Sequence, residues 1–319
     1  MTAIRTPTTR PAPATAEGAS GAPVPIAEVR ELLRGLDRRQ RQAVTYGEGP
    51  LLVVAGPGTG KTEVITRRVA WLIASKRARP SQILALTFTE RAADEMQARV
   101  DLLVPYGQAD TALHTFHAFG DWLLREHGTA IGRADDPRVI GRSQAIVLLR
   151  DHLFELGLER YRPLGDPTKF VGALVDLFGR AKEEGLGPDD LQAYATELAA
   201  GVRAAGSDLE DAAAREALEG LIDEAHSTAE LGRAYAVYQR LLAERSLVDH
   251  GDQVAEAVRL HDERPAVLVA LRRRVRYVVV DEAQDATPQQ LRLVRMLVGR
   301  GGNVAFVGDD DQAIYSFRG

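Results

Sequence analysis

The sequence predicts an α/β protein in which a parallel sheet is interrupted by a large all-helical insertion. Two strand-then-helix units follow each other within residues 51–100, and two further strand-like runs occur at residues 277–281 and 304–308. Between about residue 120 and residue 271 the chain has Ala- and Leu-rich helical patterns and no strand-like run. Strands that alternate with helices are typical of a parallel sheet, because each crossover back to the same edge needs a helix on one face.

The first strand–helix unit has the clearest pattern. LLVVA at residues 51–55 is a short continuous apolar run, as expected of a strand that is buried on both faces of a parallel sheet. In the helix that follows, Ile65, Val69 and Leu72 recur at helical spacing. The second unit repeats the pattern, with residues 83–88 as its strand. The inner stripe of its helix is predicted to be Ala92, Ala93, Met96 and Val100.

One helix of the insertion has sequence signals at both ends. Asp166 is a candidate N-cap, Pro167 would take the first helical position, and Gly185 would end the helix. Beyond the insertion the strands return, and a helix at residues 288–298 lies between the last two. The buried face predicted for the capped helix consists of Phe170, Leu174, Leu177 and Phe178.

Composition restricts the class of protein. The 319 residues are 45% hydrophobic, which suits a folded globular protein, and include no cysteine, which excludes disulfides and thiolate metal sites. The net charge of −5 gives no overall positive field, so nucleic acid would have to bind in a local groove. Residues 1–25 are rich in Pro, Ala and Thr and are predicted to be a disordered tail. Every apolar stretch is far shorter than the ~20 residues of a membrane span, so we expect a cytoplasmic protein that does not bind membranes.

A phosphate-binding loop is predicted at residues 55–62, AGPGTGKT, between the first strand and its helix. Glycines let backbone N–H groups turn towards phosphates, and the helix N-terminus adds a partial positive charge. We expect Lys61 to reach the β- and γ-phosphates of ATP and Thr62 to bind Mg²⁺. The strand–loop–helix context disfavours the alternative of a glycine-rich turn followed by a chance Lys-Thr. The predicted nucleotide-binding residues of the loop are Ala55, Gly56, Pro57, Gly58, Thr59, Gly60, Lys61 and Thr62.

Acidic and amide side chains follow two other predicted strands. Asp281 and Glu282 come at the end of YVVVD, at the carboxyl edge where ligands bind in open α/β sheets. Asp281 would hold Mg²⁺ through water, and Glu282 would activate the attacking water for phosphoryl transfer. A solvated acidic pair is the alternative, which the phosphate-binding loop makes the less favoured one. In GDDDQ at residues 308–312, Gln312 is the candidate sensor of the γ-phosphate.

Six blocks of the sequence together resemble the motifs of the UvrD/Rep DNA helicases of superfamily 1, in the same order. This resemblance implies a P-loop NTPase with a RecA-like ATP-binding domain in two parts, residues 26–120 and 272–319, and a helical insertion subdomain at residues 121–271. It also implies an ATP-dependent, 3′ to 5′ helicase that acts on single-stranded or partly duplex DNA. The blocks are LDRRQRQAV (36–44), AGPGTGKT (55–62), ALTFTERAADEM (85–96), HTFHAF (114–119), VVVDEAQD (278–285) and VGDDDQAIYSFRG (307–319).

The resemblance also assigns roles to individual side chains. It implies that Gln40 contacts the adenine edge and that aromatic rings line a single-strand groove, where each stacked base contributes roughly 1–3 kcal/mol. Phe317 stands where the family commonly has Trp. For Phe88 and His117, packing in the core is the alternative that the residues alone would favour. The implied DNA-contacting positions are Phe88, Tyr315 and Phe317, together with the polar Thr87, Thr89, Thr115 and His117.

Two departures from the family pattern affect the expected activity. Glu63 stands where the family commonly has an Arg that stacks on adenine. The sequence ends at Gly319, directly after the last block, so the second RecA-like domain and its arginines are expected to be absent. Because an arginine finger contributes about 10³–10⁵ in rate, we expect ATP binding with weak hydrolysis unless a partner supplies that domain. The alternatives are a non-motor module that binds nucleotide and single strands and, less favoured, a P-loop kinase.

Overall fold

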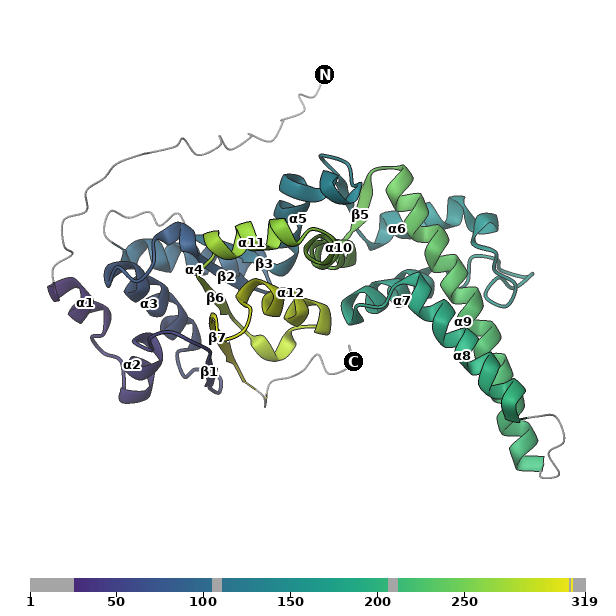
Figure 1. The fold of residues 1–319 in the computed structure, drawn as a ribbon, viewed down its shortest axis with the longest axis horizontal. Helices are drawn as coiled ribbons and strands as arrows, with labels where there is room; N and C mark the ends of the chain where they lie inside the picture. Colours follow the sequence, from purple (N-terminus) through teal and green to yellow (C-terminus); the bar gives the residue numbers. More distant parts are fainter. Residues whose placement is uncertain (1–25, 105–110, 206–211, 310, 312–319) are drawn as a thin grey trace, which may run out of the picture.

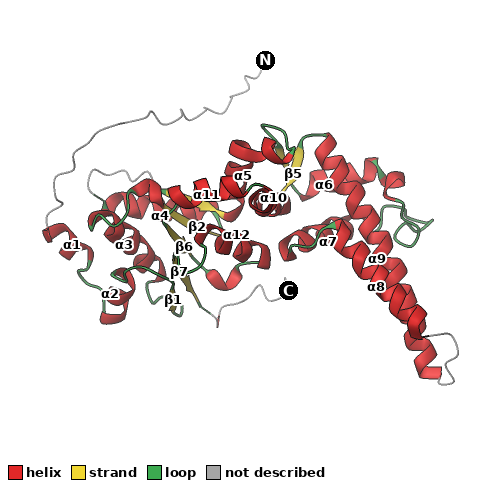
Figure 2. Cartoon of the chain, in the orientation of Figure 1, coloured by secondary structure: helices red, strands yellow, loops and turns green. Residues whose placement is uncertain are grey.

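A five-stranded sheet with helices on both faces forms one end of the protein in the computed structural model, which describes residues 26–104, 111–205, 212–309 and 311 (Figures 1 and 2). All neighbouring strands are parallel, so their carboxyl ends lie at one edge of the sheet. The predicted tail at residues 1–25 lies outside the described residues. In their order across the sheet, the strands are β1 (Leu51–Val54), β7 (Asn303–Gly308), β6 (Tyr277–Val280), β2 (Ile83–Thr87) and β3 (Ala112–Thr115).

Four helices pack on one face of the sheet and form its first hydrophobic cluster. The predicted helical spacing is confirmed, because Ile65, Val69 and Leu72 are fully buried. Met96 and Val100 are buried in the same cluster. The helices are α1 (Ile26–Leu32), α2 (Arg38–Val44), α3 (Lys61–Ala74) and α4 (Glu90–Leu103), and a short 3-10 turn, η1 (Pro80–Gln82), precedes β2.

The opposite face is covered by a second cluster, in which alternate residues of the sheet such as Leu84, Leu86 and Val280 are buried. Two of its helices span residues 250–274, of which the sequence analysis assigned residues 250–271 to the insertion, and both pack in this cluster. The covering helices are α5 (Phe116–His127), α10 (His250–Glu263), α11 (Pro265–Arg274) and α12 (Pro288–Val298). The 3-10 turn η2 (Gly128–Ile131) directly follows α5, and the 3-10 turn η4 (Ala283–Asp285) lies between β6 and α12.

The prediction that β1 is buried on both faces was wrong. β1 is an edge strand of the described sheet, and the side chains of Leu52 and Val54 are 69% and 59% exposed. The second cluster includes residues of β2, β6 and β7 but none of β1, so the covering helices do not extend over this strand. A continuous apolar run does not distinguish a central strand from an edge strand, which is why the sequence pattern misled us.

The helical insertion has its own hydrophobic cluster, which extends from Ile140 to Leu247. Its longest helices form an antiparallel hairpin that projects away from the sheet (Figure 1). Two short parallel strands also occur, which contradicts the expectation that this region has no strand. None of the helices in the described ranges is long and apolar enough to cross a membrane. The elements are β4 (Arg138–Ile140), α6 (Arg142–Asp151), η3 (Leu153–Leu156), α7 (Val171–Glu184), α8 (Pro188–Ala205), α9 (Ala212–Glu244) and β5 (Leu247–Asp249).

Helix α7 begins later than the sequence signals predicted. Its first residue is Val171, whereas Asp166 accepts hydrogen bonds from the backbone and the hydroxyl of Thr168 in a preceding turn. Asp side chains stabilise such turns as readily as helix starts, so the signal was genuine but marked a different structure. The predicted end is confirmed, since Gly185 adopts the left-handed conformation at the C-cap. Leu177, predicted to be buried, is 36% exposed.

A buried histidine in α10 is expected to make stability depend on pH. His261 is 2% exposed, and within the described residues neither ring nitrogen has a hydrogen-bond partner. Burial lowers the pKa of His261 to about 4; Asp262 opposes this shift, while Arg272 and His127 add to it. Because the unfolded chain takes up this proton near pH 6.5, the free energy of unfolding should fall as pH decreases from about 6.5 to 4.

Replacing His261 with Leu should remove this dependence. Between pH 6.5 and 4, the variant should lose up to roughly 3 kcal/mol less unfolding free energy than the unsubstituted chain. Urea unfolding at several pH values measures this difference. The exposed His226 in α9 provides the matched control, since His226→Leu should leave the slope unchanged. An unaltered slope in His261→Leu would assign the pH dependence to other groups.

Candidate functional site

The loop between β1 and α3, which the sequence predicts to bind phosphate, contains two glycines with a left-handed backbone. Gly58 and Gly60 have φ values of 70° and 85°, which side chains disfavour but glycine tolerates. The backbone N–H of Ala55 donates to the carbonyl of Gly308 at 2.9 Å, which joins the start of the loop to β7. The hydroxyl of Thr59 donates to the carbonyl of Gly56 at 2.6 Å. The loop therefore leads directly into the N-terminus of α3, where free N–H groups favour an anion.

Lys61 and Glu282 meet at the carboxyl edge of the sheet. Nζ of Lys61 is 3.2 Å from Oε2 of Glu282, and the two side chains are 10% and 39% exposed. Glu282 is the second residue after the strand β6 and has a left-handed backbone, with φ 47° and ψ 46°. A residue other than glycine is rarely held in this conformation, and such residues cluster at functional sites. The structure thus brings together two residues that were predicted from separate motifs.

Asp281 lies beside this pair at the end of β6 and is only 6% exposed. Burial, and to a lesser extent the neighbouring charge of Glu282, raise the pKa of Asp281 to about 6. The backbone N–H of Glu282 donates to Oδ1 of Asp281 at 2.9 Å, and Lys61 also favours the ionised form. Thr62 is at the start of α3, which follows β1, and only β7 separates β1 from β6. The arrangement fits a divalent cation, because a buried carboxylate and a hydroxyl flank the phosphate-binding loop.

The sequence analysis missed a bridge made by Gln284. Its Nε2 donates to Oε2 of Glu282 at 2.9 Å, and its Oε1 accepts the backbone N–H of Asp309 at 3.0 Å. Asp309 is 3% exposed, and its carboxylate reaches towards Gly56 of the phosphate-binding loop. The signal was present in the sequence, since Gln284 lies two residues after Glu282, but spacing alone does not reveal an amide that bridges two loops.

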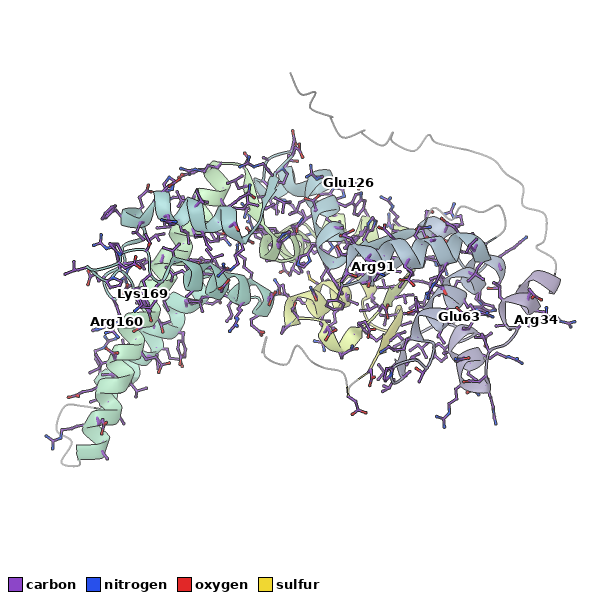
Figure 3. The ribbon with its side chains drawn as sticks, turned by 180° about the vertical axis from the view of Figure 1, so that it is seen from behind. Arg34, Glu63, Arg91, Glu126, Arg160 and Lys169 are labelled. Atoms are coloured by element: carbon purple, nitrogen blue, oxygen red, sulfur yellow. The ribbon has the colours of Figure 1, made fainter. Side chains whose placement is uncertain are left out.

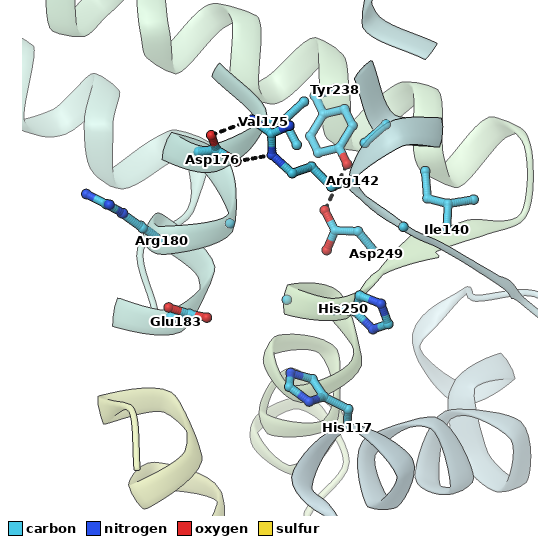
Figure 4. Close-up of a pocket in the computed structure, with 14 residues that line it drawn as sticks. His117, Ile140, Arg142, Val175, Asp176, Arg180, Glu183, Tyr238, Asp249 and His250 are labelled. Atoms are coloured by element: carbon cyan, nitrogen blue, oxygen red, sulfur yellow. Dashed lines mark hydrogen bonds and ion pairs between the residues drawn. The ribbon is translucent and has the colours of Figure 1, made fainter. Parts of the chain in front are cut away.

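A pocket of about 330 Å³ lies between the insertion and the helices α5 and α10, away from the phosphate-binding loop (Figure 4). His117 of α5 and His250 of α10 both face it, and their rings are 5.7 Å apart. Arg142 forms an ion pair with Asp176 at 2.7 Å on the opposite wall. Charges of both signs line the pocket, since Arg142 and Arg180 lie on its wall together with Asp176, Glu183 and Asp249.

Comparison with known proteins is decisive for the family. Residues 36–319 match the family model described as the UvrD/REP helicase N-terminal domain. The chain belongs to the UvrD/Rep helicase family. It is 35% identical over 291 residues to the ATP-dependent DNA helicase PcrA of Bacillus subtilis, covering 91% of this chain and 34% of that protein. It is also 31% identical over 296 residues to DNA helicase II of Haemophilus influenzae, covering 92% and 36% respectively. The chain thus spans about a third of the length of these curated relatives.

Gln40, in the block that resembles the Q motif of the UvrD/Rep helicases, anchors the phosphate-binding loop. Its Nε2 donates to the carbonyl of Thr59 at 2.9 Å. Its Oε1 accepts the backbone N–H of Asp37 at 3.0 Å, and Asp37 in return caps α2 by accepting the N–H of Gln40 at 2.8 Å. The capping box therefore fixes Gln40 beside the loop. Its contact with adenine stays a prediction.

Glu63, which the sequence analysis described as a departure from the family pattern, lies in the first turn of α3, directly after the loop (Figure 3). Its carboxylate pairs with Arg67 one helical turn later, at 2.5 Å. Arg67 also donates to the carbonyls of Leu32 and Arg34, at 2.8 and 2.7 Å. These bonds hold the guanidinium of Arg67 beside the carboxylate of Glu63.

Within the described residues, the positions that the resemblance assigns to DNA lie at the ends of β2 and β3 and in the segments that directly follow them. Phe88 is half-buried, with its ring 5.6 Å from that of Phe116. Thr89 and Thr115 are the N-caps of α4 and α5 and accept the backbone N–H groups of Ala92 and Ala118. The structure thus gives these threonines capping contacts, and DNA contact stays a prediction. Three further predicted residues, Gln312, Tyr315 and Phe317, lie outside the described residues.

Proposed function

We propose that this chain is the ATP-binding and single-strand-binding part of an ATP-dependent DNA helicase that moves 3′ to 5′. The observation that carries the proposal is the meeting of Lys61 and Glu282, 3.2 Å apart, at the sheet edge beside the phosphate-binding loop. The parallel sheet and the helical insertion support a RecA-like P-loop fold with an inserted subdomain. Family membership supports DNA as the substrate.

Five side chains have separate roles in the proposed ATPase centre. Lys61 binds the β- and γ-phosphates, and the N–H groups of the loop and of α3 surround them. Thr62 and Asp281 hold Mg²⁺, which supplies neutralisation of phosphate charge when bound. Glu282 orients the attacking water and accepts its proton. The proposal for Gln312 is that its amide detects the γ-phosphate.

The proposed DNA groove is formed by side chains that follow β2 and β3. Phe88 would stack on a base, while Thr89 and His117 would contact the strand backbone. Tyr315 and Phe317 complete the groove in this proposal. We further propose that full turnover needs a second RecA-like domain, in the same polypeptide or in a partner, since the relatives are about three times as long as this chain.

Replacing Lys61 with Ala tests the proposed function. Loss of a charge-assisted contact of about 1.5–3 kcal/mol should raise the Kd for ATP roughly 10- to 100-fold. Binding would be followed with a fluorescent ATP analogue, and turnover by phosphate release with and without a single-stranded oligonucleotide. Lys169→Ala, at the exposed lysine labelled in Figure 3, is the control and should bind like the unsubstituted chain.

The same experiment separates the two classes of protein. Absence of ATP binding by the unsubstituted chain would contradict the proposal. ATP binding that oligonucleotide neither stimulates nor alters would indicate a non-motor nucleotide-binding module instead.

A further inference from the structure

We propose that Gln284 is a positioning residue for the carboxylate of Glu282. This inference rests on the proposed function, because it concerns the residue that activates water in ATP hydrolysis. Gln284 would not touch the reacting atoms itself. Its role would be to hold the base in place and to tie it to the segment that follows β7.

The two ends of the Gln284 amide have different partners: the donor end faces an acceptor, and the acceptor end faces a donor. The Nε2 donor faces a carboxylate oxygen of Glu282 at 2.9 Å, and the Oε1 acceptor faces the backbone N–H of Asp309 at 3.0 Å. The reversed amide would place oxygen against carboxylate and N–H against N–H. The surroundings therefore determine a single orientation of this side chain.

Glu282 needs such a contact because little else restrains its carboxylate. The residue has a left-handed backbone and its side chain is 39% exposed. Its carboxylate forms an ion pair with Lys61 and accepts a hydrogen bond from Gln284. Lys61 is also proposed to bind the phosphates, so ATP would compete with Glu282 for the ammonium group of Lys61. The bond from Gln284 is independent of the substrate.

Gly308 provides the space that the amide occupies. A Cβ atom on Gly308 would lie 2.5 Å from Oε1 of Gln284 and 3.3 Å from the backbone nitrogens of Ala283 and Gln284. Real Cβ contacts of 2.5 Å do not occur, so an added methyl group would displace the amide. The absence of a side chain at the end of β7 thus makes the bridge sterically feasible.

The decisive measurement is steady-state ATP hydrolysis at several ATP concentrations, with the Kd for ATP determined separately by titration. Gln284→Met retains the length of the side chain but loses both bonds, and should lower kcat about 10- to 100-fold with KM and the Kd for ATP within about twofold. Gln284→Glu keeps the acceptor for Asp309 but loses the donor, and should lower kcat as well. Gln192→Met, at a half-buried glutamine of α8 whose Nε2 donates to the carbonyl of Ala229, is the control.

Two further variants separate positioning from a general loss of structure. Gly308→Ala should lower kcat like Gln284→Met, although it alters no side chain of the site. In a Glu282→Gln background, Gln284→Met should cause little additional loss, because the carboxylate to be positioned is gone. Additive losses in this cycle would indicate a structural role and overturn the inference.

The outcomes distinguish this inference from the function on which it rests. If the unsubstituted chain hydrolyses ATP and both Gln284 variants match it, the positioning role is refuted while the proposed function stands. If the unsubstituted chain neither binds nor hydrolyses ATP, the proposed function fails, and the role of Gln284 fails with it.

Discussion

Replacement of Glu282 by Gln is expected to lower ATP turnover by about 100-fold or more while nucleotide binding is retained. The amide has the size of the carboxylate but cannot accept a proton from the attacking water. Because Glu282 lies 3.2 Å from Lys61, its negative charge also competes with the phosphates for that lysine. The affinity for ATP should therefore stay the same or increase. Single-turnover hydrolysis and titration with a fluorescent ATP analogue measure the two effects separately.

The matched control for this prediction is Glu95→Gln in α4. Glu95 pairs with Arg99 on the protein surface, and its charge has no part in the proposed centre. Both replacements remove one negative charge, so a general effect of net charge would appear in both. Turnover that stays normal in Glu282→Gln would place the proton acceptor elsewhere and contradict the role proposed for this residue.

The motifs at the sheet edge could be predicted from the sequence because each depends on local order along the chain. A strand, a glycine-rich loop and a helix in succession place Lys61 at a helix N-terminus whatever the rest of the fold does. Asp281 follows a buried strand, and parallel strands share one carboxyl edge. The distance between Lys61 and Glu282 required the structure, but the edge at which both lie did not.

Features that depend on partners distant in the sequence were not predictable. The exposure of Leu52 and Val54 follows from the position of β1 at the edge of the described sheet, which an apolar run cannot encode. The bridge from Gln284 depends on Asp309, 25 residues further along the chain. The left-handed conformation of Glu282 is likewise invisible in its residue type, since glutamate has no preference for it.

The junction between the insertion and the sheet contains a buried ionic cluster that the sequence did not indicate either. Nζ of Lys182, in α7, is 2.6 Å from Oδ2 of Asp249 and 2.8 Å from Oδ1 of Asp252. The side chains of Lys182 and Asp252 are each 1% exposed. A Cβ on Gly251 would lie 2.8 Å from the Lys182 side chain, so only glycine leaves room for it. This cluster links α7 of the insertion to α10 on the sheet.

The charges of this cluster depend on one another. Burial raises the pKa of Asp252, and the lysine opposes that rise. Burial also acts against ionisation of Asp249, but Lys182, together with hydrogen bonds from the backbone of Asp252 and from Tyr238, holds the pKa of Asp249 below its usual range. Without the lysine, two carboxylates would remain buried with no cation between them. The cost of such an unpaired buried charge is much larger than the value of an exposed ion pair.

Lys182→Met is therefore expected to lower the free energy of unfolding by about 3–5 kcal/mol, measured by urea denaturation at neutral pH. The loss should shrink as pH decreases towards about 4, because the stranded carboxylates can then take up protons. Arg142→Met, which breaks the exposed pair with Asp176, is the control and should have a far smaller effect.

Adding Asp252→Asn to Lys182→Met should recover part of the loss, since it removes one uncompensated charge while keeping the shape of the side chain. If the double variant were less stable than Lys182→Met, packing around the lysine stem, and not the unpaired carboxylates, would be the source of the destabilisation.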